Sequence, residues 1–396
     1  MRAESASSAP AGFPPGFAEG PGEADAALSL RCLLGITPRA LHDLIWHVGS
    51  ALEAVRAIAT GTAGSENDRA FLRDVVPAEV RRRLAAAGAR LALPGDPEYW
   101  PAFARLADPP VGVFLRGLPL RLGHRRVALV GSRRPSSLGV EVVRDLGRGV
   151  TAAGLVVVSG GAIGIDARAH DAALDVGGTT VAVLGSGIDV EYPATNRGLL
   201  RTIAQRGTLV SEYPPGVPAE PFRFPARNRL IAGLSIGVVI VEGGARSGTR
   251  STADYATQLG LEVFAVPGPV TSPLSEAPHE LIRDGARLIR GYADLLEDLG
   301  FDAAQVETVS LDGLPAAEGD VLAALREPML PDAVSRAVGL SIPDTVASLA
   351  RLEIRGLVQG NGGRYRRSIA LPVAADDGGG GPDAEADGGG GRHPSG

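Results

Sequence analysis

The sequence contains no lysine: arginine supplies all 39 of its Lys and Arg side chains. A Walker A phosphate-binding loop and a Schiff-base enzyme both need a lysine, so both classes are excluded. Contacts to phosphate must come from backbone amides or from the planar guanidinium group, which often binds two oxygens at once. The abundance of Ala and Gly also fits a compositional bias of the genome, and the exclusions hold in either case.

Cysteine is nearly absent as well, since Cys32 is the only one. One cysteine cannot build a disulfide framework or a thiolate metal cluster. No apolar run approaches the ~18–20 residues of a membrane span, and the N-terminus lacks the basic start and apolar stretch of a signal peptide. We therefore expect no metal, no cofactor, no membrane contact and a cytoplasmic location.

The net charge of −6 is unevenly distributed. Residues 1–27 carry a net charge of −3 and residues 373–396 a net charge of −4, which leaves the body of the chain at +1. The acidic ends thus hide a mildly basic body, so the overall charge does not argue against nucleic acid as a ligand.

Composition and periodicity divide the chain into six segments. Residues 1–27 are rich in Pro, Gly, Ser and Ala and are expected to be disordered. Short helices in 28–93 predict a small helical domain of the sterile-alpha-motif or helix-hairpin-helix type, which either contacts a DNA backbone or only packs. The remaining predicted segments are an α/β domain (94–300), a linker (301–316), a winged-helix domain of three helices and a hairpin (317–370), and a disordered acidic Gly-rich tail (371–396).

In the central segment, apolar Val-rich runs end in Gly-rich loops, and each loop opens a helix. Continuous apolar strands indicate a sheet buried on both faces, and strands separated by helices indicate right-handed crossovers and a parallel sheet. We predict an α/β fold, a Rossmann-like doubly wound, mainly parallel sheet. The expected strands are 127–130, 155–158, 179–184, 208–210, 237–241, 262–266 and a short one near 287–289.

Ligands of such sheets bind beyond the carboxyl ends of the strands, where the first loop begins Gly131-Ser132-Arg133. Gly131 lets a phosphate approach the backbone, and Ser132 and the next helix N-terminus offer donors. Arg133 can close over the anion. Such a loop taken alone is more often a structural turn.

The second loop, Ser159-Gly160-Gly161, makes a nest of backbone N–H groups able to hold an oxyanion. Asp166 and His170 follow one helical turn apart, so the two side chains could hydrogen-bond. A role in ordering the loop is favoured over acid–base catalysis for this pair.

The segment 221–250 carries five arginines (223, 227, 229, 246 and 250) against one acid, Glu242. Arginine suits phosphates and aromatic faces suit unstacked bases. Ser247 and Gly248 stand before a helix whose N-terminus favours an anion. Glu242 is expected to order its loop, and in the alternative interpretation Arg227 and Arg229 pair with Glu212 or Glu242 instead of phosphate. The candidate binding residues here are Phe224, Arg227, Asn228, Arg229, Ser247 and Gly248.

Six motifs, GSRRPSSLG, SGGAIGIDARAH, AVLGSGIDVEYPATN, SEYPPGVPAEPFRFPARNRLIAGLS, VEGGARSGT and FAVPG, resemble in order those of the DNA-processing protein A (DprA/Smf) family, over roughly 93–299. The resemblance implies single-stranded DNA binding in natural transformation and recombination, a homodimer, and delivery of the strand to a RecA-type recombinase. It also implies a DNA pocket made by Ser132, Arg133, the 159–161 loop, Arg227, Asn228 and Arg229. The sequence departs from the family pattern at Leu138, Arg250 and His279.

Two other classes stay open. Nucleotide phosphoribohydrolases of the lysine-decarboxylase-like Rossmann group have a loop similar to Glu242–Thr252, but their catalytic glutamate has no clear equivalent here. A transcription factor would rest on the winged helix alone, and residues 342–355 offer few base-reading side chains. The loops show no nucleophile elbow and no acidic metal cluster, so we expect binding and no catalytic residue.

Overall fold

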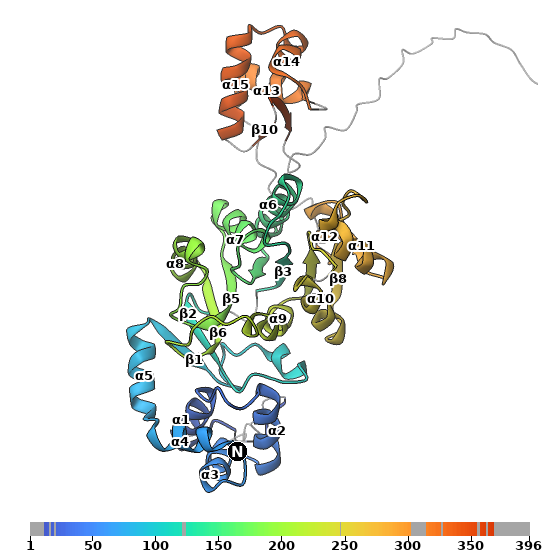
Figure 1. The fold of residues 1–396 in the computed structure, drawn as a ribbon. Coiled ribbons are helices and arrows are strands. Elements are labelled where there is room, and N and C mark those ends of the chain that lie inside the picture. Colours follow the sequence, from blue (N-terminus) through green and yellow to red (C-terminus); the bar gives the residue numbers. More distant parts are fainter. Residues whose placement is uncertain are drawn as a thin grey trace, which may run out of the picture. The chain divides into compact units, whose positions relative to one another are not determined.

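The computed structural model describes residues 12–15, 17–19, 21–120, 124–245, 247–301, 314–325, 328–354, 357–361 and 363–367. The chain forms two compact units, residues 1–313 and 314–396 (Figure 1). Among the described helices, none combines the length and apolar character needed to cross a bilayer.

The first unit opens with five helices, whose ends follow from local sequence. Side chains of Thr37, Ser50 and Ser65 accept hydrogen bonds from backbone amides at the starts of the second, third and fourth helices, as N-cap residues do. Gly49 and Gly61 end two of them in the left-handed conformation. The five helices are α1 (Pro21–Arg31), α2 (Pro38–Val48), α3 (Ala51–Thr60), α4 (Glu66–Asp74) and α5 (Pro77–Ala86).

Disorder was expected throughout residues 1–27, and the structure corrects this for the part it describes. Helix α1 begins at Pro21. The rings of Phe13 and Phe17 stack at 4.6 Å and are each 1% exposed, in a core with Leu30 and Ile45. Two buried phenylalanines supply enough apolar contact to outweigh the Pro- and Gly-rich composition. Residues 1–11 lie outside the described part.

Nine strands form one sheet in the order β1-β2-β6-β5-β4-β3-β7-β8-β9. The strands β3 to β9 pair in parallel, whereas β2 is antiparallel to both β1 and β6. This confirms the α/β, mainly parallel fold. Their bounds are β1 (Ala89–Ala92), β2 (Val113–Gly117), β3 (Arg126–Val130), β4 (Val156–Ser159), β5 (Thr180–Gly187), β6 (Thr208–Tyr213), β7 (Gly237–Ile240), β8 (Glu262–Ala265) and β9 (Arg287–Leu288).

Strands β1 and β2 were not expected, and β1 falls inside the predicted helical domain of 28–93. Both are short, and no α-helix separates either of them from the next strand. They therefore lack the alternation of strand, loop and helix that marked the other strands. Their place in the sheet depends on antiparallel pairing of β2 with β6, a contact between distant segments of the chain.

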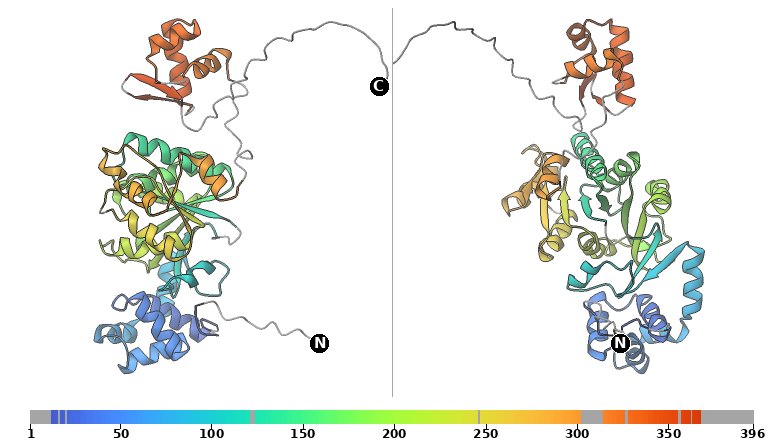
Figure 2. Two further views of the ribbon diagram at one scale, coloured as in Figure 1. Left: turned by 90° about the vertical axis from the view of Figure 1, so that its right-hand side faces the viewer. Right: turned by 180° about the vertical axis from the view of Figure 1, so that it is seen from behind.

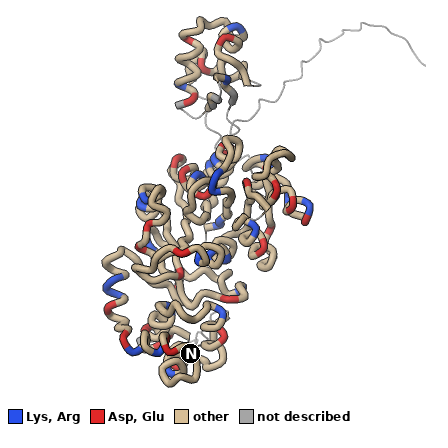
Figure 3. Tube along the Cα trace, in the orientation of Figure 1, with Lys and Arg blue, Asp and Glu red and all other residues tan. Residues whose placement is uncertain are grey.

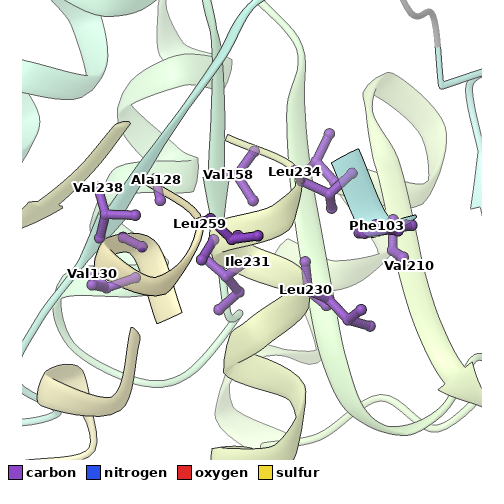
Figure 4. Close-up of a cluster of buried hydrophobic side chains, with 14 of the residues drawn as sticks. Phe103, Ala128, Val130, Val158, Val210, Leu230, Ile231, Leu234, Val238 and Leu259 are labelled. Atoms are coloured by element: carbon purple, nitrogen blue, oxygen red, sulfur yellow. The ribbon is translucent and has the colours of Figure 1, made fainter. Parts of the chain in front are cut away.

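Helices cover both faces of the sheet (Figure 2). On one face, Ala128 and Val130 of β3 pack with Leu230, Ile231 and other residues of α9 and α10 (Figure 4). On the other, Val127 packs with side chains of α6, α7 and α12. The bounds are α6 (Ser137–Ala152), α7 (Ile165–Asp175), α8 (Arg197–Arg206), α9 (Arg223–Gly233), α10 (Thr249–Gln258), α11 (Glu276–Arg283) and α12 (Tyr292–Asp298), with 3-10 turns η1 (Pro101–Arg105), η2 (Ala194–Asn196) and η3 (Pro273–Ser275).

The strand order reverses at β3. After β3 the chain adds β4, β5 and β6 on one side, then returns to place β7, β8 and β9 on the other. The loops that leave β3 and β7 therefore diverge to opposite faces. Such a switch point opens a crevice at the carboxyl ends of the two strands, where ligands of open α/β sheets bind.

The second unit contains α13 (Ala316–Ala324), α14 (Pro331–Val338), α15 (Ile342–Ile354) and the hairpin β10 (Val358–Asn361) with β11 (Arg364–Arg367). Its core includes Val321, Val334, Leu349 and Leu352. These are the three helices and hairpin expected for 317–370, and the winged-helix assignment stays a prediction. Most of the predicted linker (302–313 of 301–316) and the predicted tail, 371–396, lie outside the described residues.

Candidate functional site

A pocket of about 530 Å³ lies at the switch point. Its walls come from the loops after β3, β4 and β7, from α9 with the residues before it, and from the first turn of α10. The lining residues are Val130, Gly131, Ser132, Arg133, Arg134, Ala162, Asp166, Pro221, Phe224, Pro225, Arg227, Asn228, Ile231, Ser247, Gly248, Thr249, Thr252 and Leu274. The structure thus brings together most of the residues expected to bind an anion.

Two arginines at the mouth of the pocket carry unneutralised charge. Arg133 and Arg134 are exposed, and neither forms an ion pair with any residue in the described part of the chain. The Arg133 guanidinium lies 5.5 Å from the centroid of the Phe224 ring. The Arg134 amide donates to Ser132 Oγ at 3.0 Å, which tightens the turn. Charged groups of both signs are spread along the chain (Figure 3), so the positive character here is local.

Arg227 forms the floor of the pocket. It is 4% exposed, and its Nη1 donates to the carbonyl of Gly160 at 2.7 Å and to that of Val183. Burial lowers the pKa of Arg227 to about 10, opposed by the nearby Asp166 carboxylate. The group therefore stays charged at neutral pH. Its rigid attachment means that it adds a fixed positive field behind the mouth.

The predicted nest after β4 is partly occupied by a side chain of the protein itself. Asp166 Oδ2 accepts from the amides of Gly160 at 3.1 Å and Ala162 at 3.4 Å. Burial raises the pKa of Asp166, and Arg227 opposes that shift. His170 contacts Thr180 Oγ1 at 2.8 Å instead of Asp166, and burial lowers its pKa to about 3, so it is neutral. Asp166 thus bonds two amides of this loop, those of Gly160 and Ala162, and the binding role predicted for the 159–161 loop stays a prediction.

The helix N-terminus after the first loop is also partly occupied. Ser136 caps α6 and donates its amide to Glu242 Oε2 at 2.9 Å and its hydroxyl to Oε1 at 2.5 Å. Gly139 permits this approach, since a Cβ there would lie 2.4 Å from the Glu242 carboxyl carbon. Part of the donor set expected at this N-terminus is therefore used inside the protein, and its role in binding a phosphate stays a prediction.

Arg229 does not line the pocket, which corrects its assignment as a DNA-binding residue. Residues two apart on an α-helix point in nearly opposite directions, so Arg229 faces away from Arg227. Its Nη2 lies 2.7 Å from Glu212 Oε2 and its Nε 2.9 Å from Asp108 Oδ2. Burial alone would lower its pKa, but the two carboxylates outweigh burial and raise it. Arg31 of α1 also contacts Glu212, at 3.5 Å.

Ser159 is likewise structural. It is fully buried and its hydroxyl donates to the Leu129 carbonyl at 2.6 Å, which joins β4 to β3. Its neighbour Gly160 needs to be glycine, because a Cβ there would lie 2.6 Å from an Arg227 nitrogen. Gly160 and Gly161 line a smaller cavity of about 70 Å³ beside the main pocket.

The loop after β7 leads into α10, and the N-terminus of this helix opens onto the pocket. Asn228 Nδ2 donates to the Gly248 carbonyl at 3.1 Å and to Ser251 Oγ at 2.8 Å, which fixes the loop against α9. Ser247 Oγ accepts from the Thr249 amide at 3.3 Å. No acidic residue stands in the first turn of α10, so its positive end favours an anion in the pocket. Arg246 lies outside the described residues.

Residues 90–300 match the family model described as DNA recombination-mediator protein A. A putative DNA processing protein DprA of Mycobacterium tuberculosis (strain H37Rv) is 41% identical over 304 residues, which cover 72% of this chain and 78% of that protein. The chain belongs to the DprA/Smf family. Protein Smf of Escherichia coli (strain K12) is 38% identical over 288 residues, covering 69% and 76% of the two chains.

The structure of DNA processing protein A (DprA) from Streptococcus pneumoniae is similar with a TM-score of 0.56 and 34% identity, covering 71% of this chain and 97% of that one. The family predicted from ordered motifs is confirmed, and so is the Rossmann-like fold.

The three departures from the DprA/Smf pattern lie outside the pocket lining. Leu138 is 38% exposed on α6. Arg250 pairs with Glu280 and with Asp284 at 3.4 Å, both in or next to α11. His279 contacts the Gly268 carbonyl at 3.0 Å. None of the three departures replaces a residue that lines the pocket.

Sequence reasoning missed several residues of this DprA-family pocket. Arg134 is exposed at the mouth, as Arg133 is, and its position directly after Arg133 was the available signal. Ile231 and Leu274 give the pocket an apolar wall. Tyr192, from the loop after β5, lines the smaller cavity. Nothing in the sequence indicated which apolar residues of α9 face the pocket.

Proposed function

We propose that this member of the DprA/Smf family holds single-stranded DNA in the switch-point pocket and passes it to a RecA-type recombinase. The chain is a DNA-processing protein by family, acting in recombination and natural transformation. The proposal adds three things to this family role: single-stranded DNA as the ligand, a RecA-type recombinase as the partner, and the pocket as the binding site.

One observation carries it: at the switch point the acidic side chains are hydrogen-bonded within the protein, whereas two arginines face solvent. The carboxylates of Asp166 and Glu242 are bound to backbone amides or to a serine. Arg133 and Arg134 face solvent with no ion pair in the described part of the chain, and Arg227 adds charge behind them. The net field attracts a polyanion, and guanidinium groups bind its phosphates.

A single strand suits this pocket better than a duplex. The Phe224 ring is half-buried, and its centroid lies 5.5 Å from the Arg133 guanidinium and 6.0 Å from that of Arg227. A base reaches such a recessed ring only when it is unpaired, and stacking on aromatic rings tolerates any sequence. Exposed arginines at the mouth and a recessed ring behind them therefore favour single strands without base-specific contacts.

The geometry supports binding over catalysis. The Glu242 carboxylate contacts Ser136 and does not line the pocket, so it is not placed to act on a ligand there. Asp166 lines the pocket, but Oδ2 is held by two amides. Within the described residues, no group of three or more His, Cys, Asp or Glu side chains could hold a metal ion. Release of free base from nucleoside monophosphates, abolished by Asp166→Asn or Glu242→Gln, would overturn this part of the proposal.

The partners rest on the family. We propose a homodimer, a RecA-type recombinase as the receiving protein, a cytoplasmic location, and an accessory role for residues 317–370. Light scattering at micromolar concentration tests the dimer. A chain ending at Asp298 tests the accessory role, and it should keep most of its affinity for a strand, because every described pocket residue precedes that position.

Fluorescence anisotropy with single- and double-stranded oligonucleotides over a range of salt tests the central claim. We expect tighter binding to the single strand at every salt concentration. Replacing both Arg133 and Arg134 with Ala should flatten the salt slope by about 1.4, at about 0.7 per phosphate contact. The control variant replaces Arg39 and Arg82, exposed arginines outside the pocket, and changes the net charge equally. Equal slopes in the two double variants would contradict the proposal.

A further inference from the structure

Tyr192 is a large aromatic residue that the fold leaves half in solvent, with 49% of its surface exposed. It lies in the loop between β5 and η2. Its ring centroid is 5.6 Å from that of Phe224, and the two rings are tilted by 36°. The ring rests beside Phe224 without being buried by it, so the core of the protein does not account for its position.

The loop that carries Tyr192 is fixed at both ends. Glu191 accepts from Arg201 of α8 at 3.0 Å. Asn196 Nδ2 donates to the Gly161 carbonyl at 3.0 Å, which ties this loop to the one after β4. The loop on either side of Tyr192 is therefore tied down before any ligand arrives, which lowers the cost of ordering this loop on binding.

The site continues from the main pocket to this ring. The cavity of about 70 Å³ is lined by Tyr192, Gly161, Phe224 and Arg133, and the last two also line the main pocket. The loops involved follow β7, β3, β4 and β5, which are neighbours in the sheet. Three strand spacings are about 14 Å. This is the length of about four stacked nucleotides at ~3.4 Å each.

We propose that Tyr192 stacks on a base of the bound strand, next to the base that Phe224 contacts. This inference rests on the proposed function and extends the binding site from the switch point to the end of β5. Tyr192 then contributes through its ring face alone. Its loss weakens binding without changing the salt dependence, because no phosphate contact and no released counterion is involved.

The test compares Tyr192→Ala, Tyr192→Phe and a control, Trp46→Ala, which removes a 58% exposed aromatic residue on α2. Each is titrated with a fluorescent single strand across salt. We expect Tyr192→Ala to bind about tenfold more weakly with an unchanged salt slope, on the scale of one stacked base. Tyr192→Phe and Trp46→Ala should bind as the unchanged protein does. An oligonucleotide with 2-aminopurine at successive positions should show quenching at one position that is lost only in Tyr192→Ala.

A strand of abasic nucleotides completes the design, since it offers phosphates and no base. The unchanged protein and Tyr192→Ala should bind it equally. Equal affinity of Tyr192→Ala and the unchanged protein for the normal strand would overturn the inference, and so would an equal loss in Tyr192→Phe or a tenfold gap that persists on the abasic strand. If the unchanged protein binds no single strand, the proposed function itself fails, which is a separate outcome.

Discussion

Replacing Arg229 with Ala separates the two roles of the arginines on α9. The sequence suggested that Arg229 contacts phosphate, whereas the structure places it 1% exposed between Glu212 and Asp108. Among the described residues, the substitution leaves Glu212, which is also buried, with Arg31 at 3.5 Å as its one remaining ion-pair partner. Asp108 is less affected, because its side chain is 27% exposed and keeps contact with water.

Removing one partner of a buried ion pair costs about 3–5 kcal/mol, because the other charge stays buried. Arg31 compensates in part, so we expect a value near the lower end of that range. A loss of about 3 kcal/mol lowers the melting temperature of a domain of this size by roughly 6–12 °C. Binding should change little once the protein is folded, because Arg229 does not line the pocket.

The matched variant is Arg133→Ala, which removes an exposed guanidinium at the mouth of the pocket. We expect its melting temperature to stay nearly unchanged, as for most surface substitutions. Its affinity for a strand should fall by about 1–3 kcal/mol, and its salt slope should flatten by about 0.7. Circular dichroism melts and salt-titrated anisotropy on both variants give the comparison. The reasoning is refuted if Arg229→Ala melts normally and flattens the slope.

Three further substitutions or reactions test other parts of the structure. Gly160→Ala should lower both the affinity for single-stranded DNA and the melting temperature, because its Cβ would lie 2.6 Å from an Arg227 nitrogen. Gly198→Ala is the control, since a Cβ there would lie in open space, and equal losses in the two variants would contradict the close fit at Gly160. Burial raises the pKa of Asp145 to about 6, so its ionisation costs stability as pH rises from about 4 through 6. Asp145→Asn should therefore stabilise the fold by up to about 3 kcal/mol at pH 8 and little at pH 4, and denaturant titrations at both pH values check this. Burial raises the pKa of the Cys32 thiol to about 11; labelling with iodoacetamide at pH 8 should be slow until the protein unfolds, and rapid labelling of the native protein would count against its burial.

Much of the site could be predicted from local sequence. Val-rich runs followed by Gly-rich loops predicted the parallel strands, and parallel strands place all their loops at one sheet edge. Gly131, Arg133 and Asn228 were found in this way and do line the pocket. Strand ends were less well predicted, and β6 extends three residues beyond the expected 208–210, to Tyr213.

The sequence by itself determined the succession of parallel strands and loops along the chain, the family, and the absence of lysine chemistry, since each depends on residue type and spacing along the chain. Tertiary structure decided which charges remain for a ligand. Glu242 accepts hydrogen bonds from Ser136, 106 residues away. Arg229 points toward Glu212 and not into the pocket, because Arg227 and Arg229 lie two residues apart on α9 and so on opposite faces of it. Burial and ion pairing depend on distances between segments far apart in the chain, and a local pattern does not contain those distances.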